Sequence, residues 1–184
     1  MSKIETQDHG KQNAAAWAGN ISEMIAALEC DFDRLEELRD ERAALVDEVE
    51  ESPNASPDST AKQNLDHWDE ENADELRELT TAATLEGDLQ TDADSVRRRI
   101  EESPLSVQIR SGWVSPGDDM QAEEFEILLT TGGPALRIRG ELDEHKQADR
   151  AWLEYQDWGT PWTQYFEVEQ STLLTFCQQF YFGD

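Results

Sequence analysis

Acidic side chains recur at helical spacing in two stretches of this sequence. Residues 31–51 contain ten Asp and Glu against three Arg, and residues 66–78 contain seven acids. Side chains three and four positions apart share one face of a helix, so each stretch predicts a helix with a row of carboxylates. Two such rows on neighbouring helices would approach the charge density of DNA and occupy a basic surface without any catalysis. The candidate partner-binding residues are Asp33, Glu36, Glu37, Asp40, Asp47 and Glu48, with Asp69, Glu70, Asp74 and Glu75.

The same acids could also be present without a partner to bind. Solvated helix faces are commonly charged, and proteins of high-salt cells are generally acidic, which would suit four Lys against eleven Arg. A net charge of −27 repels nucleic acid and anionic membranes and attracts basic protein surfaces. Like charges one turn apart destabilise a helix by a few tenths of a kcal/mol per pair, so this density of acids requires a reason.

Residues that could catalyse a reaction stand apart from one another. His9, His67 and His145 are isolated, and Cys30 and Cys177 match neither a metal nor a redox spacing. The chain shows no signal-peptide pattern and no apolar run of about 20 residues. We therefore expect a cytoplasmic protein with reduced thiols, no enzyme activity, no metal, no cofactor and no membrane span.

A block of the chain occurs twice, displaced by 51 residues. Lys-Gln-Asn-x-x-x-Trp at 11–17 recurs at 62–68, and Glu-Glu-Ser-Pro at 50–53 recurs at 101–104. The apolar positions and the block ends are the parts that correspond, as in a duplicated packing unit. Each copy predicts a helical hairpin, and stacking the two hairpins would bury both apolar stripes.

Helix breaks are expected within each copy of the block. Residues 30–33 are either a turn or the middle of one long helix, and we favour a turn because Asp33 with Glu36 forms a helix-start signal. In the second copy, Gly87 indicates a helix end and Thr91 with Asp94 a restart. The expected organisation is a flexible tail at 1–10, helical repeats at 11–53 and 62–104, a linker at 54–61 and a further module at 105–184.

After Pro104 the apolar period changes from about 3.6 to 2, which indicates strands. Val107 and Ile109 begin the alternation, and turns are expected at 116–119 and 132–134. Four antiparallel strands, the last at 151–158, and a covering helix at 170–181 complete the module. The predicted fold class is therefore α+β, with two helical hairpins followed by a four-stranded antiparallel sheet and one C-terminal helix.

Aromatic residues in the loop at 157–162 are the second candidate site. Gly159 and Pro161 lie between Trp158 and Trp162 in this loop, and exposed Trp side chains anchor many protein interfaces. The competing interpretation is packing within the core or the loop. In the alternative function, the chain is a non-enzymatic adaptor or assembly module that binds a partner through this aromatic face. Amphipathic helical repeats also leave room for a homodimer.

Several runs of the sequence resemble an acidic protein family of bacteriophages, prophages and plasmids. The helix that starts with the Lys-Gln-Asn run belongs to the resemblance, as do IEESPLSVQIRSGW at 100–113, TGGPA at 131–135, RGELD at 139–143, LEYQDWGTPWT at 153–163 and FYFG at 180–183. The resemblance brings no catalytic residues. It implies a mobile-element protein in a bacterial host, where acidic proteins are often DNA mimics directed against CRISPR or restriction systems. The implied partner is a basic, nucleic-acid-handling host protein, such as a CRISPR effector or a restriction enzyme, and not nucleic acid itself.

Overall fold

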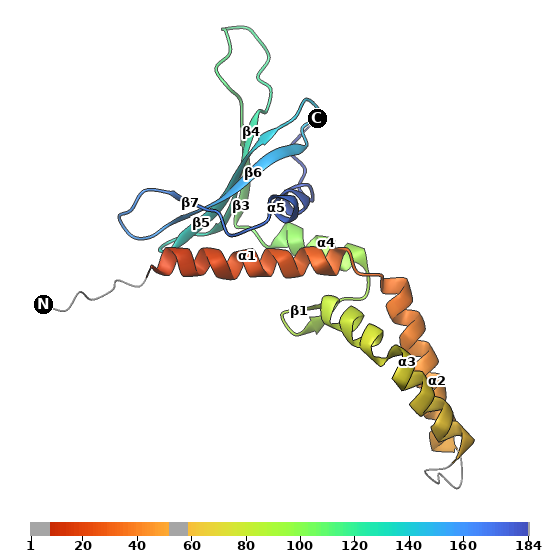
Figure 1. Ribbon diagram of the computed structural model, residues 1–184. Helices are drawn as coiled ribbons and strands as arrows, with labels where there is room; N and C mark the ends of the chain where they lie inside the picture. Colours follow the sequence, from red (N-terminus) through yellow and green to blue (C-terminus); the bar gives the residue numbers. More distant parts are fainter. Residues whose placement is uncertain (1–7, 52–58, 184) are drawn as a thin grey trace, which may run out of the picture. The chain divides into compact units, whose positions relative to one another are not determined.

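The protein is described by a computed structural model that covers residues 8–51 and 59–183 (Figure 1). Most of the predicted tail and linker therefore lies outside the described residues. The chain forms two compact units, which we name the sheet unit (Met1–Ile25 with Arg97–Asp184) and the hairpin unit (Ala26–Val96). These divisions differ from the boundaries predicted from the repeat, because most of the first helix belongs with the sheet.

The described residues contain five helices, and four of them follow the sequence repeat. They are α1 (His9–Leu28), α2 (Phe32–Glu51), α3 (Thr60–Ala82), α4 (Ala93–Glu102) and α5 (Gln170–Cys177). The starts of α1 and α3 are 51 residues apart, and so are the ends of α2 and α4. The duplication of sequence is thus a duplication of the outer helix bounds.

The break between α1 and α2 confirms the predicted turn. The residue that caps α2 is Asp31 and not the predicted Asp33, because the Asp31 carboxylate accepts the Arg34 backbone N–H at 3.0 Å. In the second copy, Asp92 caps α4 in place of the predicted Thr91 and Asp94. Asp92 accepts the Ser95 N–H at 2.6 Å, which lowers the pKa of the Asp92 carboxyl.

The two copies differ between their helices. The second copy inserts a small antiparallel pair, β1 (Thr84–Leu85) and β2 (Asp88–Leu89). Glu86 and Gly87 join the strands with φ of 51° and 86°, the pattern of a type I′ turn. Gly87 therefore forms this turn, and α3 ends at Ala82 instead of at the predicted stop.

The hairpin unit is built on α2 and α3, which pack side by side (Figure 1). The predicted hairpin within each copy is therefore wrong, because the second helix of the first copy pairs with the first helix of the second copy. Leu35 and Leu38 of α2 and Leu65 of α3 are buried between them. This apolar core is small for helices of 20 and 23 residues. Polar contacts across the pair therefore contribute to holding it together.

The sheet unit contains a five-stranded antiparallel meander. Its strands, in spatial order, are β3 (Ser106–Arg110), β4 (Glu124–Thr130), β5 (Ala135–Leu142), β6 (Ala148–Gln156) and β7 (Thr163–Tyr165). The α+β class and the antiparallel meander are confirmed, but the predicted count of four strands is wrong. β7 has three residues, which is too short to show alternation in the sequence.

Alternation along the strands separates a covered face from an open face. Helices α1 and α5 lie on the covered face (Figure 1). Asn13 of α1 donates to Thr130 Oγ1 at 3.2 Å, and the Phe182 ring lies 4.6 Å from that of Phe125. The buried side chains on this face include Phe125, Ile127, Leu136, Ile138, Leu153, Leu173 and Phe176.

A substitution at Gly140 tests how tightly the covered face is packed. A Cβ at this position would overlap the Arg150 carbonyl oxygen and the Phe125 ring. We expect Gly140→Ala to lower the free energy of unfolding by about 2–3 kcal/mol through overpacking. Urea denaturation followed by circular dichroism measures the change.

Gly19→Ala is the matched control, because a Cβ on this α1 glycine would meet no atom within 4 Å. It should raise the stability by about 1 kcal/mol through helix propensity. Equal effects of the two substitutions would contradict the packing described for the sheet.

Candidate functional site

Four of the predicted acidic residues form a row on the outer side of α2, which faces away from α3. The buried residues Leu35 and Leu38 lie on the opposite side of the helix. The four side chains are exposed, follow steps of three, four and seven, and have no ion pair within the described part of the chain. This row, the α2 outer face, consists of Asp33, Glu36, Asp40 and Asp47.

Two other predicted residues form ion pairs within the hairpin unit. The Arg34 guanidinium donates to both carboxylate oxygens of Glu75, at 3.1 and 3.0 Å, and lowers the pKa of that carboxyl. Arg42 donates to Asp69 at 2.8 Å. Asp69 and Glu75, predicted as partner contacts, therefore link α3 to α2.

Several of the remaining predicted acids make single interactions with neighbouring side chains. Glu37 accepts from Arg34 at 3.3 Å, and Asp74 pairs with Arg77 on its own helix at 2.7 Å. Glu48 also interacts within the structure. Of the predicted residues on α3, Glu70 is exposed without an ion pair in the described residues.

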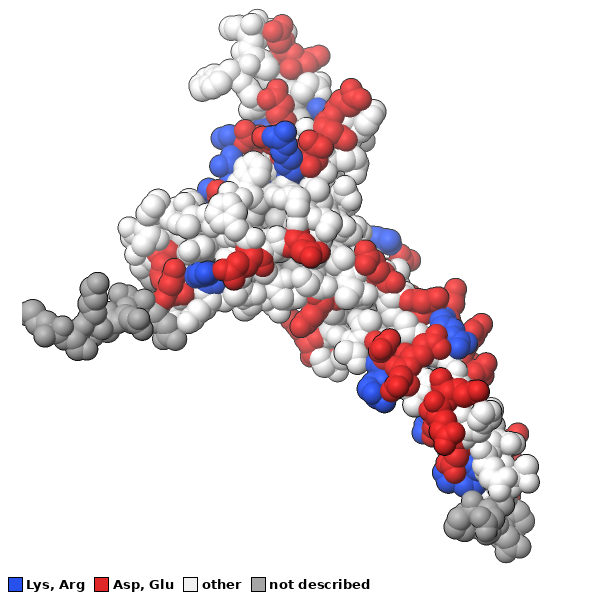
Figure 2. All heavy atoms as spheres, in the orientation of Figure 1, with Lys and Arg blue, Asp and Glu red and all other residues white. Residues whose placement is uncertain are grey.

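The two acidic rows do not merge into one surface. Glu70 and Asp74 project from the side of α3 opposite Leu65, just as the α2 outer face projects away from α3. The rows therefore point to opposite sides of the hairpin, because the apolar stripes that pair the helices lie between them. Figure 2 shows acidic side chains crowded over α2 and α3, with a few basic ones among them.

The two predicted tryptophans have different environments. Trp158 is 78% exposed, and its indole lies against Gly133 in the turn between β4 and β5. Trp162 is half-buried, with the Arg137 guanidinium 4.0 Å from its ring centroid. Trp162 thus packs on the sheet, while Trp158 stays accessible to a partner.

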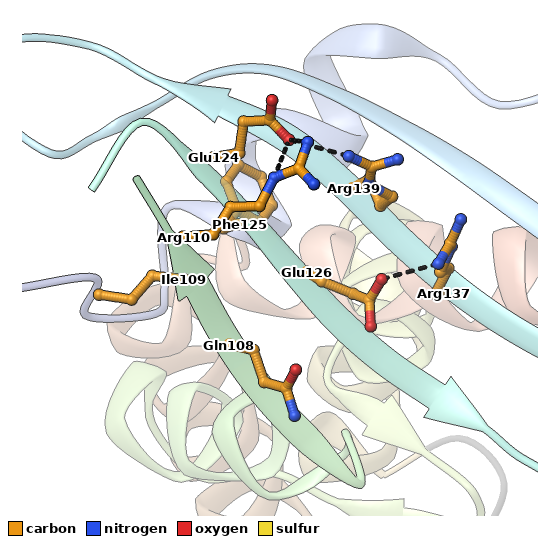
Figure 3. A pocket seen from close by; sticks show the side chains of 8 residues that line it. All are labelled: Gln108, Ile109, Arg110, Glu124, Phe125, Glu126, Arg137 and Arg139. Atoms are coloured by element: carbon orange, nitrogen blue, oxygen red, sulfur yellow. Dashed lines mark hydrogen bonds and ion pairs between the residues drawn. The ribbon is translucent and has the colours of Figure 1, made fainter. Parts of the chain in front are cut away.

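A network of ion pairs that we did not predict covers the open face of the sheet (Figure 3). Glu124 accepts from Arg110 and from Arg139, each at 2.8 Å. These residues border a shallow hollow of about 210 Å³. The signal was present in the sequence as Glu-x-Glu at 124–126 and Arg-x-Arg at 137–139, which the antiparallel register brings side by side.

Arg137 is the centre of this network. It donates to Glu126 at 2.8 Å and to Glu154 at 2.7 Å, beneath the Trp162 ring. The side chains of Arg137 and Glu154 are only 17% and 16% exposed. The carboxylates neutralise the guanidinium, so an external ligand would first have to displace an ion pair.

Neither cysteine is suited to nucleophilic chemistry. Cys30 donates to the Leu79 carbonyl at 3.6 Å, Cys177 is buried in α5, and neither forms a disulfide. Burial raises the pKa of both thiols, which disfavours the reactive thiolate. Within residues 8–51 and 59–183, no group of three His, Cys, Asp or Glu side chains is placed to hold a metal ion.

Comparison with known proteins finds no matching family model, no similar curated protein and no similar solved structure. The resemblance to the phage and plasmid family, and the function it implies, stay predictions. Of the helices in the described part of the chain, none combines the length and apolar character needed to cross a bilayer.

The Arg137 network predicts a large cost for losing its central cation. We expect Arg137→Met to lower the free energy of unfolding by about 2–3 kcal/mol, because the largely buried Glu154 and the half-buried Glu126 carboxylates lose their partner. Arg150→Met is the control, since Arg150 is 69% exposed in its pair with Glu141, and it should cost about 0.5 kcal/mol or less. Urea denaturation measures the free energy of unfolding of both variants. Equal losses would show that the network does not stabilise the sheet.

The Glu75 ion pair predicts a pH dependence. Arg34 lowers the pKa of Glu75 in the folded state below its ordinary value of 4.5, so the unfolded chain binds more protons as the pH falls. The stabilisation is complete above that ordinary value and is lost as the pH drops through the lowered one. Glu75→Gln should therefore melt below the wild type at pH 7, with the difference closing towards about pH 3.

Thermal unfolding followed by circular dichroism from about pH 7 to 3 measures this effect. Glu70→Gln is the control, because Glu70 has no ion pair in the described residues. If the difference in melting temperature between Glu75→Gln and the wild type stayed constant with pH, the ion pair would not be its cause.

Proposed function

We propose that this chain is a non-enzymatic inhibitor that binds a basic, nucleic-acid-handling host protein through the α2 outer face. The proposed partner is a component of a CRISPR or restriction system, as expected for a phage or plasmid protein. The observation that supports it is the row of four exposed carboxylates without ion pairs in the described residues. The surrounding charge adds to it, since α2 has nine acids against three bases and α3 has seven against two.

The spacing of the carboxylates on the α2 outer face suggests which phosphates of a nucleic acid they replace. Asp33 and Asp47 are fourteen residues apart, or about 21 Å along a helix. Four carboxylates over that length give one charge per roughly 5–7 Å, whereas one DNA strand carries one per about 3.4 Å of axis. The row therefore suits a single track of Lys and Arg that contacts one strand, and it is too sparse for a whole duplex.

Electrostatic binding of this kind depends on salt. Charges exposed to solvent are screened beyond about 10 Å at 0.1 M salt. The complex should form quickly at low salt and weaken steeply as the salt rises. Binding through an aromatic anchor would respond little to the same change.

Charge reversal of the row tests the proposal. The variant carries Asp33→Lys, Glu36→Lys, Asp40→Lys and Asp47→Lys. The matched control reverses four exposed acids outside the hairpin unit, Glu101, Glu102, Asp119 and Asp149, and so has the same net charge. Each protein is used to capture partners from a bacterial lysate at low and high salt, with mass spectrometry of the eluates.

We expect the wild type and the control to retain a nucleic-acid-handling protein that leaves at high salt, and the α2 variant to retain at least about tenfold less. The purified partner should then cleave or bind its nucleic acid in the presence of the α2 variant but not of the wild type. Equal capture by the α2 variant, or no such partner for the wild type, would rule the proposal out.

Trp158 supports a second candidate function, the adaptor or assembly module. Its exposed indole beside Gly133 is the kind of side chain that anchors a protein partner. A partner that resists high salt and is lost with Trp158→Ala would favour this function over inhibition.

A further inference from the structure

The edge strand β3 has one side without a strand partner in the described residues. It pairs with β4 only, at the end of the sheet order. Val107 and Ile109 project on the covered face beside Ile127 and Phe125, yet they are 38% and 51% exposed. Edge strands are usually protected by charges, prolines or bulges. β3 carries one charge, on Arg110 at its end.

The strand β3 also lies within a stretch of the sequence that contains no Asp or Glu. In a chain with 42 acids, only four stretches of fourteen or more residues contain none: 9–22, 103–117, 127–140 and 170–183. Three of them supply buried residues of α1, of β4 and β5, and of α5. The stretch at 103–117 is the longest, yet most of its side chains are exposed. Two copies of so acidic a chain can approach each other most closely at this surface.

β3 is complementary to itself in one register. Antiparallel pairing about a two-fold axis requires opposite residues to lie on the same face, which among the residues of β3 leaves Val107 opposite either another Val107 or Ile109. Only the second register pairs all five residues of β3. It puts Val107 beside Ile109 of the second copy, twice, with Ser106 beside Arg110 and Gln108 on the axis.

We infer that β3 is a dimerisation edge, which pairs with β3 of a second copy about a two-fold axis at Gln108. The two five-stranded sheets become one continuous sheet of ten strands. Cross-strand pairs of β-branched side chains stabilise a sheet, and this pairing covers Val107 and Ile109. No carboxylate lies opposite another in the paired strands, because β3 contains none.

The residues that flank β3 extend the same surface. Leu105 is exposed before the strand, and Trp113 is fully exposed in the loop that follows it. These two side chains therefore place apolar surface at both ends of the proposed pairing.

Disulfide crosslinking tests the register. In a Cys30→Ser background, which leaves only the buried Cys177, Gln108→Cys places two thiols across the axis at about 4.5–5.5 Å between Cα atoms. Ser106→Cys is the matched control, because its two copies would be four residues out of register, about 13 Å apart along the strands. We expect mild oxidation to convert Gln108→Cys into covalent dimer at least about tenfold more than Ser106→Cys.

The mass in solution gives an independent measurement. Light scattering should show twice the monomer mass of 20.9 kDa for the wild type. Ile109→Lys should return the protein to a monomer with an unchanged circular dichroism spectrum, whereas Phe166→Lys, at an exposed position away from β3, should not. Added salt should strengthen the dimer by screening the net charge, the opposite of its effect on the proposed inhibitor complex.

A wild-type protein that stays monomeric at about 100 μM in high salt would overturn the inference, as would equal crosslinking of the two cysteine variants. A monomer that instead captures an extended peptide along β3 would also contradict it, since the edge would then serve another partner. None of these outcomes depends on the charge reversal of α2, so the two proposals fail separately.

Discussion

The shortage of bases is the constraint on which the rest of this structure depends. With 42 acids and 15 Lys and Arg, most carboxylates must remain in solvent, and the few guanidiniums determine which elements pack together. Arg34 and Arg42 link α3 to α2, where the apolar core is small. Arg110, Arg137 and Arg139 join neighbouring strands across the open face of the sheet. Both units therefore combine an apolar layer with a layer of ion pairs.

The same constraint explains why two copies of one sequence block are used differently. Residues 9–22 of α1 contain no acid, so Ala14, Ala18 and Ile21 can be buried in the sheet unit. The equivalent helix α3 carries seven acids, Leu65 is its buried residue, and it packs chiefly against α2. Acid content, more than helix length, distinguishes a helix that covers a sheet from one that pairs with another helix.

The sequence was informative wherever a periodic pattern was long. The 51-residue displacement of the repeat recurs in the spacing of the outer helix bounds, and the change of period after Pro104 predicted the meander. Local chemistry was less reliable: Asp31 and Asp92 cap the helices in place of the predicted residues, and the short strand β7 had no readable alternation. At the candidate site, helical spacing identified the carboxylates but could not show that Asp69 and Glu75 face Arg42 and Arg34, because those pairs depend on how two helices meet.

The opposed outer faces of α2 and α3 also determine how many partner molecules one chain can bind. A basic partner seated on Asp33 and Asp40 leaves Glu70 and its neighbours on the far side of the hairpin in solvent. One hairpin therefore has two tracks, and a second basic molecule could bind without displacing the first. Such a chain would hold two partner molecules at once when the partner is in excess, whereas an excess of the chain would distribute the partners over separate copies.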